Sequence, residues 1–293
     1  MTDFGFKKTF ADKEALMDFL NSLLVLSEKI VDLEYLSPEL FGYKKNQRRA
    51  AYDIHCKTLS GKHFIIEMQI AEQKYFSDRM LYYAALAIVN QAPKGKVTKI
   101  NKKGKEKKVD WDYEISGVYI VAILDFVIFK EECAQNIIVE HVELIRKYAK
   151  LPFTNKYEFA TVELPKFTKS LQSISCTLDQ WLYTFRNMHK LQECPKEITN
   201  PIIQKIYKES KLNNLTGEEM ETYRKSILEY DDVFHAVNWA REQSLKKGIV
   251  IGEKRGIGIG EKKGIEIGEK KGIEIGEKKG IEIGEKRGIG IGE

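Results

Sequence analysis

Three polar side chains stand within two apolar, β-type segments of the chain, at a spacing that suits joint chemistry. Asp53 lies in the segment AAYDIHCKT, and Glu67 and Gln69 lie in the segment HFIIEMQI. Successive side chains of a strand alternate between its two faces, so Glu67 and Gln69 point to the same face. Residues 59–62 (LSGK) between the segments predict a hairpin turn, which would bring Asp53 alongside that face.

Two carboxylates and an amide on otherwise apolar strands favour a bound cation. Burying a carboxylate in apolar surroundings is costly unless a positive charge joins it. Mg²⁺ suits such a site, because it takes oxygen ligands, keeps several waters and binds phosphate. A bound Mg²⁺ can activate a water molecule and stabilise charge on a phosphodiester. We therefore expect a Mg²⁺ site at Asp53 and Glu67, although their loose spacing by itself also fits outward-facing residues of a half-exposed sheet.

The elements that must position these residues are predicted from the spacing of apolar side chains. This order of elements indicates an α/β fold with a mixed central sheet flanked by helices. The chain gives a helix over 4–26 with a break at 11–14, strands over 30–36, 50–58 and 63–70, a helix over 77–91 capped by Ser77, a buried strand over 113–124, extended pieces at 137–144 and near Val162, and helices from 177 to 247.

The chain divides into three expected parts. Residues 1–165 form the α/β core, 166–247 a helical annex, and 248–293 a Gly-rich tail of repeated octads with the pattern GIxIGEKK. Eight residues turn a helix by about 800°, so the apolar positions of the octads drift and form no fixed stripe. The glycines disfavour a helix, whereas a Glu four residues before a Lys in several octads favours one. We expect a marginal helix that continues from 233–247 and is disordered in part.

Composition and charge limit the functions open to this chain. Of the 293 residues 43% are hydrophobic, but no apolar run approaches the roughly 18 residues that a membrane span needs. The start of the chain does not match a secretory signal, and the four cysteines lack metal-ligand spacing, so we expect a cytoplasmic protein. The net charge of +5 permits a polyanionic partner without requiring one.

Two basic clusters are candidates for contact with the phosphates of a nucleic acid. Lys44, Lys45, Arg48 and Arg49 stand just before the first hairpin strand, and residues 94–108 contain eight lysines. A solvated hairpin loop explains the lysine-rich segment as well as phosphate contact does. Phosphate contact would give an affinity that falls steeply with salt concentration.

A set of short motifs surrounds the three polar residues and extends over roughly residues 1–150. The motifs are Asp53, Ile66-Glu67-Met68-Gln69, Phe76 with Arg79 and Tyr83, Asp3-Phe4-Gly5-Phe6-Lys7-Lys8, Asp18-Phe19-Leu20-Asn21 and Trp111-Asp112-Tyr113. This set resembles the core of the Rpn family of recombination-promoting nucleases, also called PD-(D/E)XK nuclease family transposases. In that family an Asp-bearing strand precedes an IEMQ strand, and a helix with the pattern F-x-x-R-x-x-x-Y follows.

The resemblance implies a restriction-endonuclease-like fold and Mg²⁺-dependent cleavage of DNA, with a role in recombination, mobile elements or phage defence. It implies that Asp53 and Glu67 bind the metal, and that Gln69 occupies the place where related nucleases carry a Lys. A neutral Gln can form hydrogen bonds but cannot bring a positive charge to the transition state. The rate of turnover is therefore open at this point.

The resemblance also implies supporting roles for residues on the first and third helices. Arg79, Tyr83, Lys7 and Asp3 are expected to contact phosphate or to support the carboxylates. A purely structural ion pair would explain Arg79 equally well. Either Asp3 or Glu14 is a candidate for a further carboxylate from the first helix.

Other interpretations stay open on the sequence. His55 and His63 are expected to face the side of the sheet opposite to Asp53 and Glu67, as sheet histidines rather than metal ligands. The main alternative function is a DNA-binding or defence protein with a nuclease fold and little turnover. A second alternative is a self-associating assembly protein, a homo-oligomer held together by the octad tail.

Overall fold

The structure of the protein is a computed structural model that describes residues 2–40, 50–93, 97–100, 105–188, 193–210 and 214–289. The chain forms two compact units, Met1–Phe234 and His235–Glu293. The basic cluster Lys44, Lys45, Arg48 and Arg49 lies outside the described residues, as do four of the lysines of 94–108. The candidate site lies in the first unit.

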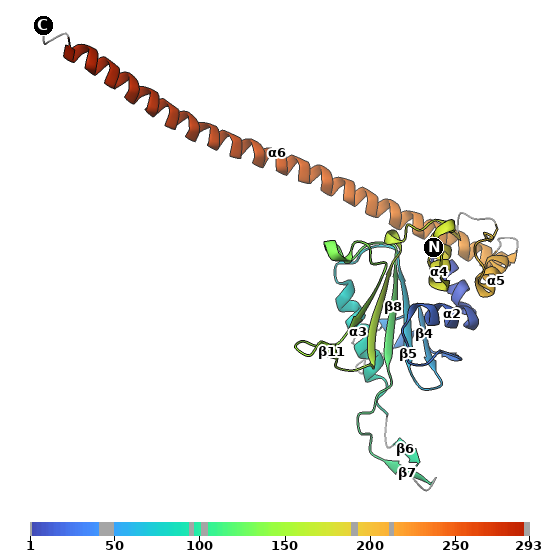
Figure 1. Ribbon diagram of the computed structural model, residues 1–293. Coiled ribbons are helices and arrows are strands. Elements are labelled where there is room, and N and C mark those ends of the chain that lie inside the picture. Colours follow the sequence, from blue (N-terminus) through green and yellow to red (C-terminus); the bar gives the residue numbers. More distant parts are fainter. Residues whose placement is uncertain are drawn as a thin grey trace. The chain divides into compact units, whose positions relative to one another are not determined.

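A six-stranded mixed sheet lies at the centre of the first unit (Figure 1). The central strands β5, β8 and β12 run parallel, whereas the outer strand pairs on both sides of them are antiparallel. The carboxyl ends of the parallel strands therefore meet at one edge of the sheet, together with the amino end of β4. The strand order is β1 (Leu33–Tyr35), β4 (Ile54–Thr58), β5 (His63–Gln69), β8 (Val118–Leu124), β12 (Tyr157–Glu163) and β9 (Val139–Glu143).

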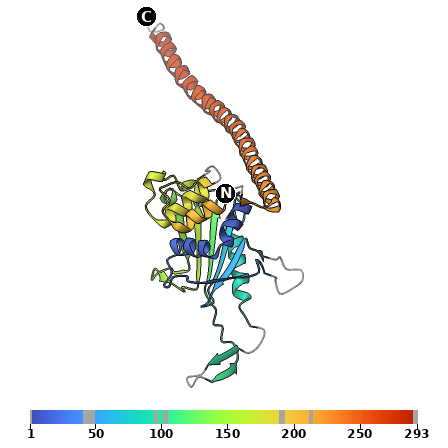
Figure 2. The same ribbon diagram turned by 90° about the vertical axis from the view of Figure 1, so that its right-hand side faces the viewer.

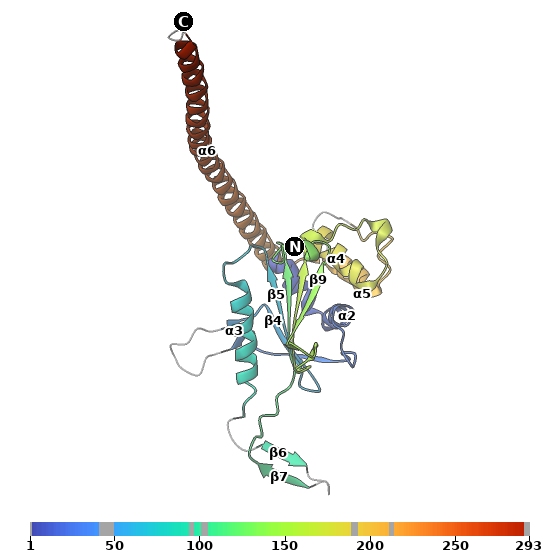
Figure 3. The same ribbon diagram turned by 60° about the vertical axis from the view of Figure 1, so that its left-hand side comes forward.

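Helices cover both faces of this sheet, which gives three layers (Figure 3). All seven residues of β8 are buried, because that strand is covered on both sides. In Figure 2 the N-terminal helices (blue) and the helices of residues 177–209 (yellow) lie on the same side of the sheet. One face carries α3 (Phe76–Val89), and the other carries α1 (Asp3–Ala11), α2 (Lys13–Leu23), α4 (Thr177–Asn187) and α5 (Pro201–Glu209).

Several predicted boundaries change in the structure. The predicted break in the first helix is confirmed: Asp12 ends α1, and its carboxylate accepts from the backbone N–H groups of Glu14 and Ala15 to cap α2. The predicted cap at Ser77 is wrong, because α3 begins one residue earlier and Tyr75 precedes it without a side-chain cap. β12 is a full central strand rather than a short extended piece near Val162.

Smaller elements connect these layers. The lysine-rich segment includes the predicted hairpin, whose strand β7 exposes Lys107 and Lys108 to solvent. Among the described residues, three short pairs of strands lie outside the main sheet. They are β2 (Glu39–Leu40) with β3 (Ala50–Ala51), β6 (Val97–Ile100) with β7 (Glu106–Val109), and β10 (Ile145–Arg146) with β11 (Leu151–Pro152), and short 3₁₀ turns occupy Glu132–Ala134, Leu164–Lys166 and Leu171–Ser173.

The last helix, α6 (Gly217–Ile289), begins in the first unit and continues through the octads. In the octads, Lys270 pairs with Glu266 at 3.0 Å and Lys278 with Glu274 at 2.9 Å, as the spacing predicts. The octad isoleucines from Ile249 to Ile283 are more than half exposed, because their drift around the helix leaves no common face to bury. Within the part of the chain that the structure describes, no helix is both long and apolar enough to cross a membrane.

Asp18 on α2 connects three helical segments of the core. Its carboxylate accepts from the indole N–H of Trp181 at 2.8 Å and from the side-chain amide of Asn200 at 2.9 Å. Trp181 is fully buried in α4, and Asn200 caps α5 by accepting from the N–H of Ile202. The Asp of the DFLN motif is therefore a structural residue.

Replacement of Asp18 by Ala leaves these two donors without their acceptor. We expect the free energy of unfolding to fall by roughly 2–4 kcal/mol, since an unsatisfied buried donor costs about 1–3 kcal/mol. Urea denaturation of the full chain measures this loss. Asp32→Ala is the control, because the ion pair of Asp32 with Lys13 is exposed. Equal losses in the two variants would contradict the structural role of Asp18.

Candidate active site

The candidate site lies at the edge of the sheet where the parallel strands end. Asp53 immediately precedes β4, and Glu67 and Gln69 lie at the carboxyl end of β5. The register pairs Ile54 of β4 with Ile66 of β5, which places Asp53 beside Glu67. In α/β sheets, ligands bind outside the carboxyl ends of the parallel strands, so the three residues stand where a substrate is expected.

Each of the two carboxylates accepts a hydrogen bond from the backbone of the segment that carries the other. The backbone N–H of Asp53 donates to Oε1 of Glu67 at 3.2 Å, and the backbone N–H of Met68 donates to Oδ2 of Asp53 at 2.7 Å. The amide of Gln69 donates to Oε2 of Glu67 at 3.4 Å. The predicted hairpin thus brings all three polar residues into one hydrogen-bonded group, and their positions are set by the backbone rather than by flexible loops.

Burial makes this pair of acids electrostatically unfavourable. Glu67 is only 2% exposed. Burial raises the pKa of Glu67 to about 8, and the neighbouring charge of Asp53 adds to the rise. Burial also raises the pKa of Asp53, against the opposing effects of the Met68 N–H and of the positive charges of Lys7 and Arg79. The site therefore favours a proton or a cation between the two carboxylates.

The donor set fits a hard divalent cation such as Mg²⁺. The two carboxylates offer oxygen ligands, the type that Mg²⁺ prefers, and burial, which raises the pKa of both, disfavours their charged forms when no cation is bound. Among the described residues, no group of three or more His, Cys, Asp or Glu side chains is arranged to hold a metal. Two carboxylates with water in the remaining positions match Mg²⁺, which usually retains several waters.

A line of polar side chains leads from Glu67 to α3. Gln69 accepts from the amide of Gln73 at 3.4 Å, and Gln73 accepts from Nη1 of Arg79 at 2.5 Å. The guanidinium of Arg79 lies 5.7 Å from the ring centres of both Phe76 and Tyr83. Its Nε and Nη2 atoms are buried and have no hydrogen-bond partner among the described residues.

Helix α1 brings two charged residues toward the carboxylates. Lys7 forms an ion pair with Asp3 at 2.9 Å. Burial alone would lower the pKa of Lys7, but the hydrogen bond and charge of Asp3, followed by the charges of Asp53 and Glu67, raise it above its ordinary value. The charge of Asp3 also acts on Asp53. Of the two candidates for a further carboxylate, Asp3 is therefore the one whose charge acts on Asp53.

Glu14 lies elsewhere in the structure. Its carboxylate is 3.7 Å from the amine of Lys205, which also pairs with Asp12. This contact ties α2 to α5, so Glu14 has a structural environment and does not supply the further carboxylate.

The structure adds two residues that the sequence reasoning missed. Gln73 connects Gln69 to Arg79, and nothing in its loop marked it beforehand. Asp125 follows β8 directly: its N–H donates to the carbonyl of Gln69 at 2.9 Å, and its carboxylate accepts from the hydroxyl of Tyr230 at 3.0 Å. The sequence does offer one signal for Asp125, which is its position directly after the apolar segment that forms the buried strand β8.

The prediction that His55 and His63 face away from the site is wrong. His55 stands two residues after Asp53, and His63 stands four residues before Glu67, so alternation places each on the same face as its acid. Their rings lie side by side, with Nε2 of His55 3.1 Å from Nδ1 of His63. Burial lowers the pKa of both histidines. They form a hydrogen-bonded pair farther along the hairpin.

The layered mixed sheet, with an acid before one strand and an acid-x-amide sequence on the next, is consistent with the PD-(D/E)XK class of nuclease folds. Residues 1–240 match the family model described as PD-(D/E)XK nuclease family transposase, and the chain belongs to this family. The resemblance noted in the sequence is thereby confirmed. Neither the curated proteins nor the solved structures contain a significant match to this chain.

The raised pKa of Glu67 predicts a pH-dependent stability when divalent cations are chelated. Between the unfolded value of 4.5 and the folded value of about 8, the folded state binds more protons than the unfolded state. The free energy of unfolding should therefore fall as pH rises through this window, by up to a few kcal/mol. Urea denaturation in EDTA across the window measures this slope.

Glu67→Gln carries no titrating group at this position, so its slope should be shallower. The exposed residue Glu72, which pairs with Lys130 on the surface, provides the control variant Glu72→Gln, which should keep the wild-type slope. A stability that is flat or rises with pH in the wild type, with the same profile in Glu67→Gln, would rule out the buried acid as its source.

Proposed function

We propose that this protein is a Mg²⁺-dependent DNA endonuclease that hydrolyses phosphodiester bonds in the context of recombination or mobile elements. The family indicates nuclease chemistry linked to transposition. The single observation that supports the proposal is the pair of Asp53 and Glu67 at the carboxyl edge of the sheet, in which Glu67 is buried and each carboxylate accepts a hydrogen bond from the backbone of the segment that carries the other. Such a pair is costly to fold and suits a site for a cation and a phosphate.

In this proposal Asp53 and Glu67 hold the cation. A bound Mg²⁺ would supply Lewis acidity toward a phosphate oxygen and lower the pKa of a water molecule. The N–H groups of Asp53 and Met68 fix the orientation of the two carboxylates. Gln69 keeps Glu67 in place and connects it to Gln73, which positions Arg79.

DNA is the substrate that fits both the family and the surface charge. The exposed lysines of β7 offer contacts to phosphates at a distance from the catalytic residues. Such contacts would set affinity without reading base sequence. We therefore expect binding that depends on salt and varies little with DNA sequence.

Purified protein should nick supercoiled plasmid in the presence of Mg²⁺ and should not do so in EDTA. The variants Asp53→Asn and Glu67→Gln keep the size of each side chain but remove its charge. We expect each to lower the nicking rate by at least about 100-fold, the scale seen when one charge-stabilising group is removed from an active site. Gel electrophoresis of plasmid forms over time measures the rate.

The matched control is Glu72→Gln, which removes an exposed carboxylate and should nick at the wild-type rate. Absence of nicking by the wild type with any of several divalent metals would overturn the proposal in favour of DNA binding with little turnover. Equal nicking by wild type and Asp53→Asn would overturn the assignment of the site.

A further inference from the structure

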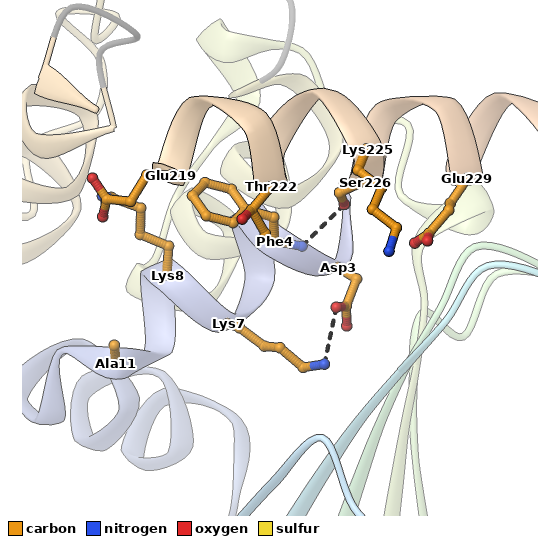
Figure 4. Close-up of a pocket in the computed structure, with 10 residues that line it drawn as sticks. All are labelled: Asp3, Phe4, Lys7, Lys8, Ala11, Glu219, Thr222, Lys225, Ser226 and Glu229. Atoms are coloured by element: carbon orange, nitrogen blue, oxygen red, sulfur yellow. Dashed lines mark hydrogen bonds and ion pairs between the residues drawn. The ribbon is translucent and has the colours of Figure 1, made fainter. Parts of the chain in front are cut away.

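The lysines of α1 are balanced by acids of the same protein. In the cavity between α1 and the first turns of α6, Lys7 forms an ion pair with Asp3, and Lys8 forms one with Glu219 (Figure 4). The hairpin that contains β10 and β11 differs from this cavity, because it is basic and contains no acid. We call residues 144–153 the basic hairpin.

The charge of the basic hairpin is unbalanced. Its sequence, LIRKYAKLPF, contains Arg146, Lys147 and Lys150, and the nearest acids along the chain are Glu143 and Glu158. All three cations are exposed, and none of them forms an ion pair with another residue that the structure describes. The basic hairpin therefore presents three positive charges to solvent, and a polyanion can neutralise them.

The basic hairpin also exposes large apolar side chains. Tyr148 at its tip is 94% exposed and Phe153 is 74% exposed, and about half of each side chain is exposed in Leu144, Ile145 and Leu151. A group of exposed apolar side chains indicates an interaction surface. Cations that can contact phosphates, next to apolar groups that can contact base edges, match the two kinds of surface that DNA offers.

The backbone of the basic hairpin forms a two-stranded ribbon. β10 pairs antiparallel with β11, and beyond this pair the N–H of Phe153 donates to the carbonyl of Leu144 at 2.7 Å. The N–H of Lys150 donates to the carbonyl of Arg146 at 2.9 Å and closes the turn. The major groove of B-DNA admits a two-stranded ribbon, so the shape of the hairpin fits duplex DNA.

The basic hairpin lies at the edge of the sheet opposite to the candidate site. It follows the edge strand β9, whose last residue Glu143 pairs with Glu158 near the amino end of β12. The seven residues of β12 separate the two edges of the sheet by roughly 20 Å. Figure 1 shows the hairpin, labelled at β11, projecting from the sheet. Its contacts therefore act on DNA affinity and do not reach the phosphate at Asp53 and Glu67.

We propose that the basic hairpin is a DNA-binding element that enters the major groove of a duplex, with Arg146, Lys147 and Lys150 on phosphates and Tyr148 against the bases. The inference rests on the proposed function, in which DNA is the substrate, and it gives the chain a contact with DNA remote from the cleavage site. A second copy of the hairpin is a poor occupant, because two surfaces of the same positive charge repel each other.

The first test removes the three charges together, as Arg146→Gln, Lys147→Gln and Lys150→Gln in the full chain. Binding to a duplex oligonucleotide is measured by fluorescence anisotropy over a range of salt concentrations, with Ca²⁺ in place of Mg²⁺. We expect the slope of log affinity against log salt to become smaller by about three, and the affinity at low salt to fall at least about tenfold.

The matched control removes the same charge from the octads of α6. Lys262, Lys263 and Lys271 are exposed lysines of that helix, and their replacement by Gln changes the net charge of the chain equally. This variant should keep the wild-type slope. At saturating plasmid, the nicking rate of the hairpin variant should stay within about twofold of the wild type, since the hairpin is remote from the acids. Circular dichroism melting verifies that each variant is folded.

The second test addresses the apolar tip. Tyr148→Ser should weaken duplex binding by roughly fivefold at every salt concentration, because it removes apolar contact area and no charge. The salt slope should therefore be unchanged. A single-stranded oligonucleotide of the same length has no groove, and its affinity should be the same for Tyr148→Ser and the wild type.

The outcomes separate this inference from the proposed function. A wild type that binds duplex DNA through the basic hairpin but does not nick it would overturn the endonuclease proposal and support the inference. Wild-type affinity and slope in the hairpin variant, or equal losses in the hairpin and octad variants, would overturn the inference. Loss of binding to phosphatidylserine vesicles with unchanged DNA binding would also overturn it and assign the hairpin to a membrane surface. Equal weakening of single-stranded and duplex binding by Tyr148→Ser would rule out insertion into a groove.

Discussion

The arrangement of this protein depends on two carboxylates that lie side by side, that of Glu67 buried and that of Asp53 half-buried. The carboxylate of Glu67 accepts from the backbone N–H of Asp53, and the carboxylate of Asp53 accepts from that of Met68. Burial raises the pKa of both acids, and the charge of Asp53 raises that of Glu67 further. A protein keeps such a pair only when the surrounding fold over-determines it. The six-stranded sheet does so: β8 is buried on both faces, and it holds β5 and, through β5, the hairpin strand β4.

The remaining features of the site follow from that unfavourable pair. Arg79 approaches through Gln73 from α3, and Lys7 approaches with Asp3 from α1, so positive groups flank the acids from two helices. Within the described residues, neither cation forms an ion pair with Asp53 or Glu67, and Lys7 pairs with Asp3 instead. Gln69 connects Glu67 with Gln73 through hydrogen bonds and brings no charge to the site.

The core of the fold and the central residues could be predicted from the sequence, because they depend on short-range patterns. Alternation in 63–70 and the glycine turn at Gly61, whose φ is +82°, determine the hairpin and hence the pairing of Asp53 with Glu67. The neighbourhoods of Lys7 and Asp125 could not be predicted this way. They depend on contacts of α6 with segments that are distant in the sequence, 222 residues apart for Phe4 and Ser226 and 105 residues apart for Asp125 and Tyr230, and no local pattern encodes such contacts.

Some sequence expectations stay predictions. The roles of Asp53 and Glu67 as metal ligands, self-association through the octad tail and a cytoplasmic location belong to this group. The octad tail is an example. Its described isoleucines are exposed along α6, and apolar positions that drift around a helix do not define one face to which a partner could bind. The prediction for the histidines failed for a simpler reason. An even number of residues separates His55 from Asp53 and His63 from Glu67, so the alternation of a strand already places each histidine on the same face as the acid.

The central claim is that a protonated Glu67 gives up its proton when a divalent cation binds beside Asp53. Calorimetric titration of the DNA-free protein with Mn²⁺ at pH 7, repeated in buffers of different ionisation enthalpy, counts the protons released. A carboxyl with a pKa of about 8 is mostly protonated at this pH, so about one proton should be released per cation bound. Glu67→Gln should release none. Saturable binding without proton release, or the same release from Glu67→Gln, would contradict the account.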